Sequence, residues 1–191
     1  EIARSNGLSV IEDCAQAHGA SIGSQMVGTF GDIGTFSFCQ DKIMSTGGEG
    51  GMIVTNSNDY YEAAWSLRDH GRDRVLTLSS EHPPGFRWLQ NRFGTNARMT
   101  EMQSAIGRCQ LKKVDEWIEQ RRSNASQLSE IISSWDGVHV PEFSAQLKSA
   151  YYRFGMLCDS VEIRNHYMKS LIEIGIPATV GWLGSTTSMT C

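Results

Sequence analysis

Short apolar runs predict three β-strands in the first third of the chain. Residues 8–12 form an apolar run that ends at two acidic residues, Glu12 and Asp13, which is typical of a buried parallel strand. Residues 34–38 and 51–55 are β-rich runs with glycines around them, and they predict two further strands. Asp13 is therefore expected at the carboxyl end of a strand.

Helical spacing of apolar positions predicts two helices in the middle of the chain. The segment 60–68 has helical composition and follows Asn58, a suitable N-cap. Residues 100–133 form the longest predicted helix, which starts with a capping box made by Thr100 and Gln103. A helix of this length is expected to bridge two domains.

The segments around these helices indicate how the chain is divided. Residues 71–94 contain two prolines and three glycines and are expected to form an irregular, functional loop. A strand over 151–157 and an amphipathic helix over 161–174 follow the long helix. We therefore predict one domain over residues 1–135 and the start of a second over residues 136–191. Strands alternating with helices predict an α/β fold.

Composition and charge exclude several classes of protein. With 40% hydrophobic and 20% charged residues, the chain has the composition of a globular domain. The formal net charge of −4 disfavours nucleic acid as a partner. No apolar run approaches the ~20 residues needed to span a bilayer, and the first residues lack the order of a signal peptide, so we expect a cytoplasmic protein without a membrane segment.

Several local features are expected to have no catalytic or metal-binding role. The five cysteines are scattered without a C-x-x-C pair, which predicts free thiols and no metal site. The basic pairs 112–113 and 121–122 are interpreted as a solvated helix face, and His18 and His70 as residues that make hydrogen bonds in loops. Residues 184–191 are small and polar and are expected to be a disordered or foreign tail.

The first candidate for chemistry is Asp13, which is followed by the small residues of segment 14–20. In open α/β sheets ligands bind beyond the carboxyl ends of the strands, so the Asp13 carboxylate is placed to meet a cationic group of a ligand. The alternative is that Asp13 caps the turn that follows it.

The second candidate is Lys42, in the loop that leaves the strand 34–38, five residues after Ser37. Most lysines are solvated surface charges, but this one precedes the glycine-rich run 45–51. So many glycines imply backbone held close to a ligand or in positive φ. The run lacks the Gly-Lys-Ser/Thr of a P-loop and leads into a strand where a dinucleotide-binding fingerprint would open a helix, so both nucleotide-loop interpretations are disfavoured.

Several motifs follow one another along the chain: Glu-Asp-Cys-Ala-Gln-Ala-His-Gly-Ala (12–20), Gly-Asp-Ile-Gly-Thr-Phe-Ser-Phe (31–38), Lys42 with Gly-Glu-Gly-Gly (48–51), Leu-Arg-Asp-His-Gly (67–71), and the segment 94–107 that begins Gly-Thr-Asn-Ala-Arg-Met. In this order they resemble the DegT/DnrJ/EryC1/StrS family of sugar aminotransferases, which depend on pyridoxal 5′-phosphate (PLP). The similarity extends from about residue 8 to about residue 180.

The resemblance implies a role for each matching residue. Lys42 corresponds to the lysine that holds PLP as a Schiff base and moves the proton during transamination. Asp13 corresponds to the aspartate that pairs with the pyridine nitrogen, and Gln16 to a residue beside the ring hydroxyl. Ser37 corresponds to a phosphate-binding serine. Asn96 corresponds to an asparagine that reaches the cofactor phosphate of the neighbouring subunit, which implies a homodimer with shared active sites.

The resemblance also implies a fold and a reaction. The fold is that of a fold-type I PLP-dependent transferase: part of the large domain, with a mixed, mostly parallel sheet, and the start of the small α+β domain. The reaction moves an amino group from an amino acid, L-glutamate by analogy, to a keto-sugar. The sugar is expected to be nucleotide-linked and destined for lipopolysaccharide or another polysaccharide or amino sugar. Arg98 and the loop 71–94 are weaker candidates for the substrate side.

The chain departs from the family pattern at Cys39-Gln40-Asp41 and at Ala97, which implies a changed acceptor preference. Two alternatives remain beside transamination: a PLP-binding dehydratase or regulatory homologue, and an inactive fragment that acts only in assembly. The dehydratase branch carries His in place of the lysine, so Lys42 favours transfer.

Family members are longer, with a phosphate-binding turn and a stacking aromatic before the region that matches residue 1. We therefore expect the chain to be part of a longer protein.

Overall fold

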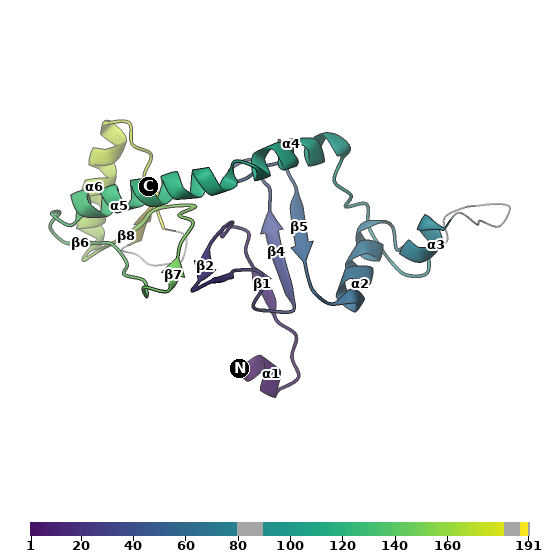
Figure 1. The fold of residues 1–191 in the computed structure, drawn as a ribbon. Coiled ribbons are helices and arrows are strands. Elements are labelled where there is room, and N and C mark those ends of the chain that lie inside the picture. Colours follow the sequence, from purple (N-terminus) through teal and green to yellow (C-terminus); the bar gives the residue numbers. More distant parts are fainter. Residues whose placement is uncertain (80–89, 182–187, 191) are drawn as a thin grey trace. The chain divides into compact units, whose positions relative to one another are not determined.

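The computed structural model describes residues 1–79, 90–181 and 188–190 (Figure 1). The chain forms two compact units. The first consists of residues 1–18 and 25–113, and the second of residues 19–24 and 114–191. Both contain strands and helices, which agrees with the predicted α/β class.

A three-stranded sheet forms the centre of the first unit. Its strand order is β1 (Ile11–Asp13), β4 (Ile33–Ser37), β5 (Gly51–Val54). β1 runs parallel to β4, as predicted, and β5 runs antiparallel to it. The expected burial of the first strand is wrong for this chain: Ile11 is 66% exposed, because the side chains of the described residues leave it uncovered. The unit also contains the short elements α1 (Ile2–Ser5) and β3 (Gln25–Met26).

The helices of the first unit follow the sheet in sequence. α2 (Asn58–Arg68) is capped by Ser57, whose hydroxyl accepts from the Tyr60 backbone, and not by the predicted Asn58. The predicted loop 71–94 contains a short helix, α3 (Arg74–Leu78), because the Asp73 side chain caps it by accepting from the backbone of Leu76. Residues 80–89 of that loop lie outside the described residues.

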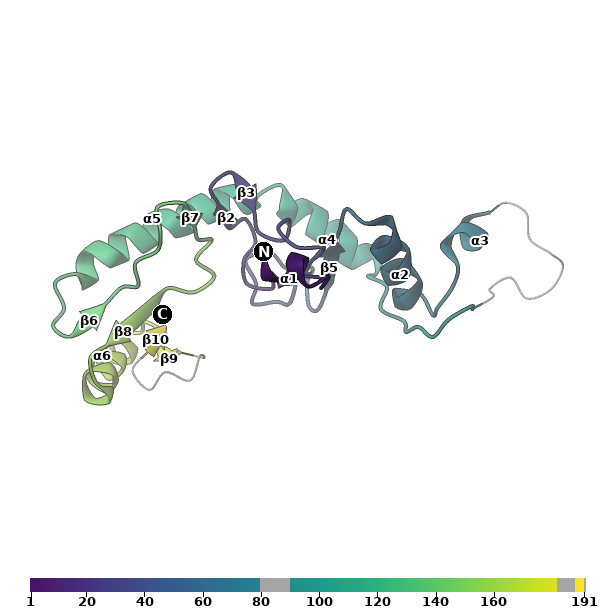
Figure 2. The same cartoon turned by 90° about the horizontal axis from the view of Figure 1, so that it is seen from below.

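The long helix predicted over 100–133 is two helices. α4 (Glu101–Leu111) starts with the predicted capping box, which the structure confirms, and α5 (Val114–Ile132) follows it. The helical hydrogen bonding stops at residues 112–113, where the Lys113 backbone donates to the Gln110 carbonyl at 2.8 Å. Within the first unit, α4 lies at the end of the sheet where β4 ends and β5 begins (Figures 1 and 2).

The second unit contains a four-stranded sheet with the order β6 (Val138–His139), β8 (Gly155–Cys158), β10 (Ser188–Thr190), β9 (Thr179–Val180). In a separate pairing, β2 (Ser21–Ile22) runs antiparallel to β7 (Leu147–Lys148). α6 (Val161–Glu173) is the predicted amphipathic helix and lies beside β8 (Figure 2). Residues 188–190 were expected to be a disordered tail, but they pair with β8 and β9.

The core of the second unit explains where the chain divides. Ala125 and Ile132 of α5 are buried in one cluster with Met156 of β8 and Leu171 of α6. Because α5 contributes to this core, the two units divide between Lys113 and Val114, ahead of the boundary expected at residues 135–136.

The arginine pair of α5 also has a structural role. Arg122 donates from Nε to the Ser149 carbonyl at 2.9 Å and from Nη2 to the Gly19 carbonyl at 3.1 Å, and Arg121 donates to the Tyr151 carbonyl at 3.1 Å. The prediction of a solvated face at 121–122 is therefore wrong. Arginine can satisfy several loop carbonyls at once because it carries five N–H donors in a fixed fork.

Candidate active site

The structure brings Asp13 and Ser37 to the same edge of one sheet. Asp13 is the last residue of β1 and Ser37 the last of β4, and the two strands are parallel with Asp13 opposite Thr35. The backbone of Cys14 donates to the Thr35 carbonyl at 2.8 Å, which keeps the ends of the strands together. The Asp13 Oδ1 atom accepts from the Ala15 backbone at 3.0 Å, and the Ser37 hydroxyl accepts from the Cys39 backbone at 3.3 Å.

Glu12 fixes the end of β1, a role that the sequence reading missed. Its carboxylate accepts hydrogen bonds from the backbone of Gly28 at 2.8 Å, Phe30 at 2.6 Å and Gly31 at 2.7 Å. Burial raises the pKa of Glu12, but the three backbone donors outweigh it and hold the pKa below its ordinary value. The nearby Gly34 has no room for a side chain, since a Cβ there would lie 2.5 Å from the Gly28 carbonyl oxygen.

Lys42 is not a solvated surface charge. Its side chain is 13% exposed, and Nζ lies 3.7 Å from the Asp41 carboxylate. The Lys42 backbone donates to the Cys39 carbonyl at 3.0 Å, so the residue sits in a turn directly after β4. Lysines are rarely buried to this degree without a specific reason.

The glycine-rich run after Lys42 is held by α4. Gly47 and Gly48 have φ values of +79° and +153°, as the glycine content led us to expect. The Gln103 side chain donates to the Glu49 carbonyl at 2.7 Å, and the Gln110 side chain accepts from the Ser45 backbone at 2.7 Å. Two turns of α4 separate the two glutamines, so one face of the helix fixes both ends of the loop.

His18 is buried, 6% exposed, against the rings of Phe36 and Phe38 at centroid distances of 5.5 and 5.9 Å. It was predicted to make hydrogen bonds in a loop: the backbone of Ser37 is its polar neighbour, although within the described residues neither ring nitrogen meets that backbone in good hydrogen-bond geometry. Burial lowers the pKa of His18; the backbone of Ser37 opposes this effect, and the positive charge of Lys42 adds to it. A buried imidazole with so poorly aligned a protein partner can take a further polar group from a ligand or from water.

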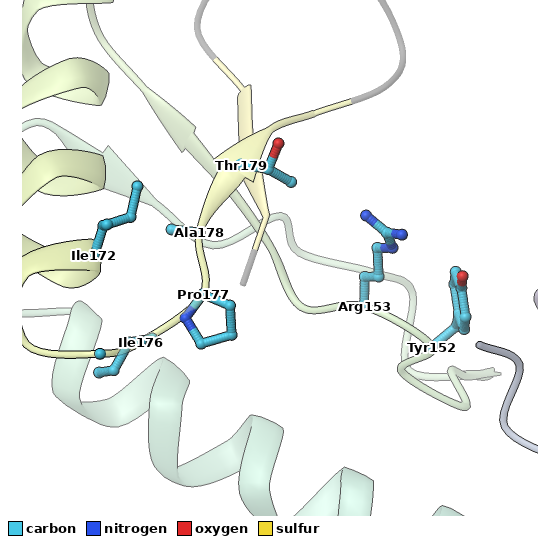
Figure 3. Close-up of a pocket in the computed structure, with 8 residues that line it drawn as sticks. Tyr152, Arg153, Ile172, Ile176, Pro177, Ala178 and Thr179 are labelled. Carbon is cyan, nitrogen blue, oxygen red and sulfur yellow. The ribbon is translucent and has the colours of Figure 1, made fainter. Parts of the chain in front are cut away.

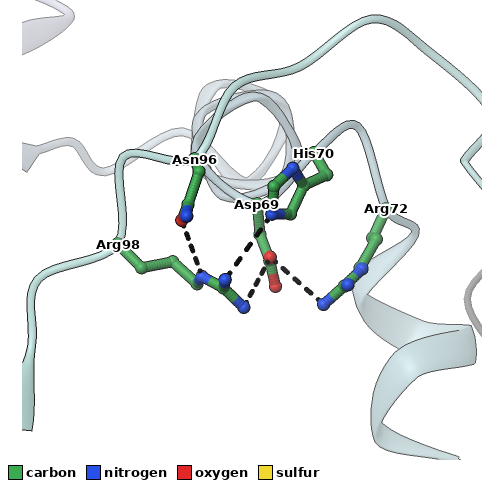
Figure 4. Close-up of polar contacts among 5 residues, drawn as sticks. All are labelled: Asp69, His70, Arg72, Asn96 and Arg98. Carbon is green, nitrogen blue, oxygen red and sulfur yellow. Dashed lines mark hydrogen bonds and ion pairs between the residues drawn. The ribbon is translucent and has the colours of Figure 1, made fainter.

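Gln16 and Asn96 take no part in the hydrogen bonds described for Asp13, Ser37 and Lys42. Gln16 is exposed in the turn after β1. Asn96 belongs to a second cluster, at the end of α2, where its side-chain oxygen accepts from Arg98 Nε at 3.2 Å (Figure 4). In the same cluster the buried Asp69 accepts from Arg72 at 3.3 Å and from Arg98 at 3.1 Å.

The second unit has a hollow of its own, of about 650 Å³ (Figure 3). Its lining is mainly apolar, and at its rim the Arg153 guanidinium lies 5.3 Å from the centre of the Tyr152 ring. The hollow contains none of the predicted site residues. Its lining residues are Tyr152, Arg153, Ile172, Gly175, Ile176, Pro177, Ala178 and Thr179.

The residues of the first unit offer a coherent set of ligand-binding groups. A carboxylate and a hydroxyl end two adjacent parallel strands, a lysine amine follows the second strand ahead of a glycine loop, and a buried imidazole packs against Phe36 of that strand. These groups suit a ligand that carries an aldehyde, a basic ring nitrogen and an anionic group. Neither a metal-binding group of three His, Cys, Asp or Glu side chains nor a helix long and apolar enough to cross a membrane is found in the described ranges.

Comparison with known proteins identifies the family. The model of the DegT/DnrJ/EryC1/StrS aminotransferase family matches residues 1–188. The GDP-perosamine synthase of Escherichia coli O157:H7 is 37% identical over 177 residues, which cover 91% of this chain and 45% of that protein. The UDP-N-acetyl-3-dehydro-alpha-D-glucosamine 3-aminotransferase of Acidithiobacillus ferrooxidans is 35% identical over 153 residues, which cover 80% of this chain and 38% of that protein.

The fold agrees with this relationship. The X-ray structure of the aminotransferase from Psychrobacter cryohalolentis superimposes with a TM-score of 0.87 at 40% identity, covering 94% of this chain and 49% of that one. The chain thus spans about half the length of the relatives it matches. The expected family and the expected α/β fold, part of that of its aminotransferases, are confirmed: the chain belongs to the DegT/DnrJ/EryC1/StrS aminotransferase family.

Proposed function

We propose that this chain carries the part of the active site of a PLP-dependent aminotransferase that contains the cofactor-binding lysine, Lys42. The observation that carries the proposal is the environment of Lys42, whose side chain is 13% exposed directly beyond the sheet edge where β1 and β4 end. Asp13 and Ser37 end those strands, and α4 holds the glycine loop that follows the lysine. An amine, a carboxylate, a hydroxyl and a close backbone are the groups that PLP requires of its protein.

Each of these residues then has a defined role in the proposed reaction. Bound PLP supplies an electron sink for the carbon that loses its proton. Lys42 Nζ would bond to the cofactor aldehyde carbon until the amine of the donor displaces it, and the freed amine would then accept the migrating proton and return it. The Asp13 carboxylate keeps the ring nitrogen protonated; Oδ1 already accepts from Ala15, so Oδ2 is the oxygen assigned to the ring. The Ser37 hydroxyl donates to a phosphate oxygen, and Gln16 lies beside the ring hydroxyl.

The substrates proposed are an amino acid donor, with L-glutamate expected, and a nucleotide-linked keto-sugar. The names of the two relatives at 37% and 35% identity, a GDP-perosamine synthase and an aminotransferase of a UDP-linked dehydro-glucosamine, support this class of acceptor. We assign the product to lipopolysaccharide or another amino-sugar polymer, the reaction to the cytoplasm, and the active enzyme to a homodimer in which Asn96 reaches the neighbouring cofactor phosphate.

The direct test is the absorption band of lysine-bound PLP. The purified protein with added PLP should show this band, and borohydride or Lys42→Ala should abolish it. Lys112→Ala is the matched control, because Lys112 is an exposed lysine at the end of α4. A wild-type protein that stays colourless in excess PLP overturns the proposal and supports the assembly alternative.

A second measurement separates transfer from the dehydratase or regulatory alternative. Transamination predicts that L-glutamate removes the band and yields one 2-oxoglutarate per bound cofactor, without a sugar present. A dehydratase or sensor keeps the band under the same conditions. Lys42 itself favours transfer, since by the family resemblance the dehydrating branch carries histidine at this position.

A further inference from the structure

The Arg98 guanidinium is fixed by three different residues (Figure 4). Its Nε donates to the Asn96 side-chain oxygen at 3.2 Å, and its Nη1 lies 3.1 Å from Asp69 Oδ1. Its Nη2 lies 3.5 Å from Nε2 of His70. A planar group with one neighbour on each nitrogen has little rotational freedom left, so Arg98 has a defined orientation.

The anchor of this arrangement is Asp69. Asp69 is 5% exposed, and its Oδ1 atom also accepts a hydrogen bond from Arg72 at 3.3 Å. A buried carboxylate is costly unless it is paired, and two guanidinium groups supply that pairing. Asp69 therefore holds Arg98 from the side of α2, while Asn96 receives it from the segment 94–98.

The backbone keeps these two segments together. Asp69 and Asn96 form an antiparallel bridge, His70 donates to the Thr95 carbonyl at 3.0 Å, and Ala97 donates to the Arg68 carbonyl at 2.9 Å. The two backbone segments approach so closely that a Cβ atom on Gly94 would lie 2.0 Å from the Gly71 nitrogen. The side chains of Asp69, Arg98 and Asn96 thus start from a rigid backbone.

The chemistry of arginine decides which way the Asn96 amide points. Arginine has donors and no acceptor, so only the amide oxygen of Asn96 can face Arg98 Nε. The NH₂ group is consequently turned away from Arg98, and Asn96 is exposed. In this orientation the amide offers two N–H donors to an external oxygen, and the opposite flip is excluded while Arg98 is in place.

We propose that Arg98, anchored by Asp69, is a positioning residue that keeps the Asn96 NH₂ group directed at the phosphate oxygens of the cofactor in the neighbouring subunit. The inference rests on the proposed function, in which Asn96 meets that phosphate. Without Arg98 the amide turns freely, and its oxygen meets the anion for part of the time. One oriented hydrogen bond to a charged group corresponds to roughly tenfold in affinity.

The test compares PLP with pyridoxal, which binds the same lysine but lacks the phosphate. Arg98→Met should weaken PLP binding roughly tenfold and leave pyridoxal binding unchanged, as measured by titrating the absorption band. Asn96→Ala should show the same selectivity. In the Asn96→Ala background, Arg98→Met should have no additional effect, because the group it orients is gone. Arg108→Met, at an exposed arginine of α4, is the matched control.

Asn96→Asp covers the case in which Arg98→Met does not fold. This variant keeps an oxygen facing Arg98 but replaces the NH₂ group with a second oxygen, so the folded protein should lose PLP affinity and retain pyridoxal affinity. Equal losses for PLP and pyridoxal, or additive effects of Arg98→Met and Asn96→Ala, overturn the positioning role. A wild-type protein that binds neither compound overturns the proposed function itself, which is a different result.

Discussion

The Gln103 side chain donates a hydrogen bond at 2.7 Å to the backbone carbonyl of Glu49, 54 residues earlier in the chain. The same side chain closes the capping box of α4, where its oxygen accepts from the Thr100 backbone at 3.0 Å. One glutamine therefore starts the helix and attaches it to the glycine loop behind Lys42. Because of this double use, the shape of the loop depends on α4 being folded.

Gln103→Ala should loosen both structures. We expect a loss of about 1–2 kcal/mol in the free energy of unfolding, from the lost cap and from the lost hydrogen bond to the Glu49 carbonyl. PLP should also dissociate faster, since the loop after Lys42 loses its attachment. Urea denaturation and the decay of the absorption band after dilution measure the two effects. Gln120→Ala, on the exposed face of α5, should change neither.

Gly107 is expected to tolerate no branched side chain. It is buried on α4, and a Cβ there would lie 3.0 Å from Thr46 Cγ2 and 3.6 Å from the end of Met44. Gly107→Val should therefore cost about 1–3 kcal/mol by displacing the loop, although valine forms helix slightly better than glycine. Ala105→Val, at an exposed position of the same helix, is the comparison. Similar stabilities of the two variants in thermal denaturation would refute the close contact.

Glu12 should give the protein a specific sensitivity to acid. The pKa of Glu12 in the folded state is below its ordinary value of 4.5, so the unfolded chain binds this proton more readily. The stabilisation is complete well above pH 4.5 and is lost as the pH falls through the lower folded-state pKa. Glu12→Gln should remove this dependence and lower the stability at neutral pH, because an amide cannot accept all three backbone donors. Urea midpoints between pH 3 and 7 measure it, with Glu142→Gln, at an exposed carboxylate, as control.

His18 should make the stability of the protein depend on pH in a higher pH range than Glu12 does. Burial lowers its pKa below the ordinary value of 6.5, so the folded protein keeps the ring neutral where the unfolded chain begins to protonate it. Stability should therefore fall as the pH drops below about 6.5. His18→Phe, which keeps an aromatic ring against Phe36 and Phe38, should flatten the curve in this range. An unchanged slope in thermal denaturation between pH 5 and 7 would show that the imidazole is not held neutral.

The sequence alone predicted the elements whose signals are local. The capping box of Thr100 and Gln103, the helix predicted over 161–174 and the strands predicted before Asp13 and Lys42 depend on neighbouring residues. The structure contains each of these elements, within a few residues of its predicted bounds. The order of the motifs was also sufficient to identify the family. These signals survive because capping, helical periodicity and positive φ at glycine are properties of a few consecutive residues.

Only the tertiary structure decided the features that join distant segments. The long helix predicted over residues 100–133 is interrupted after Leu111, and the second helix, α5, contributes Ala125 and Ile132 to the core of the second unit. The burial of Lys42 and the contact of Arg98 with Asp69 carry no local signal, since each requires segments that are separate in sequence to meet. Residue identity thus determined which chemistry the chain contains, whereas long-range packing determined which side chains are fixed, buried or unpaired, because only packing sets their distances.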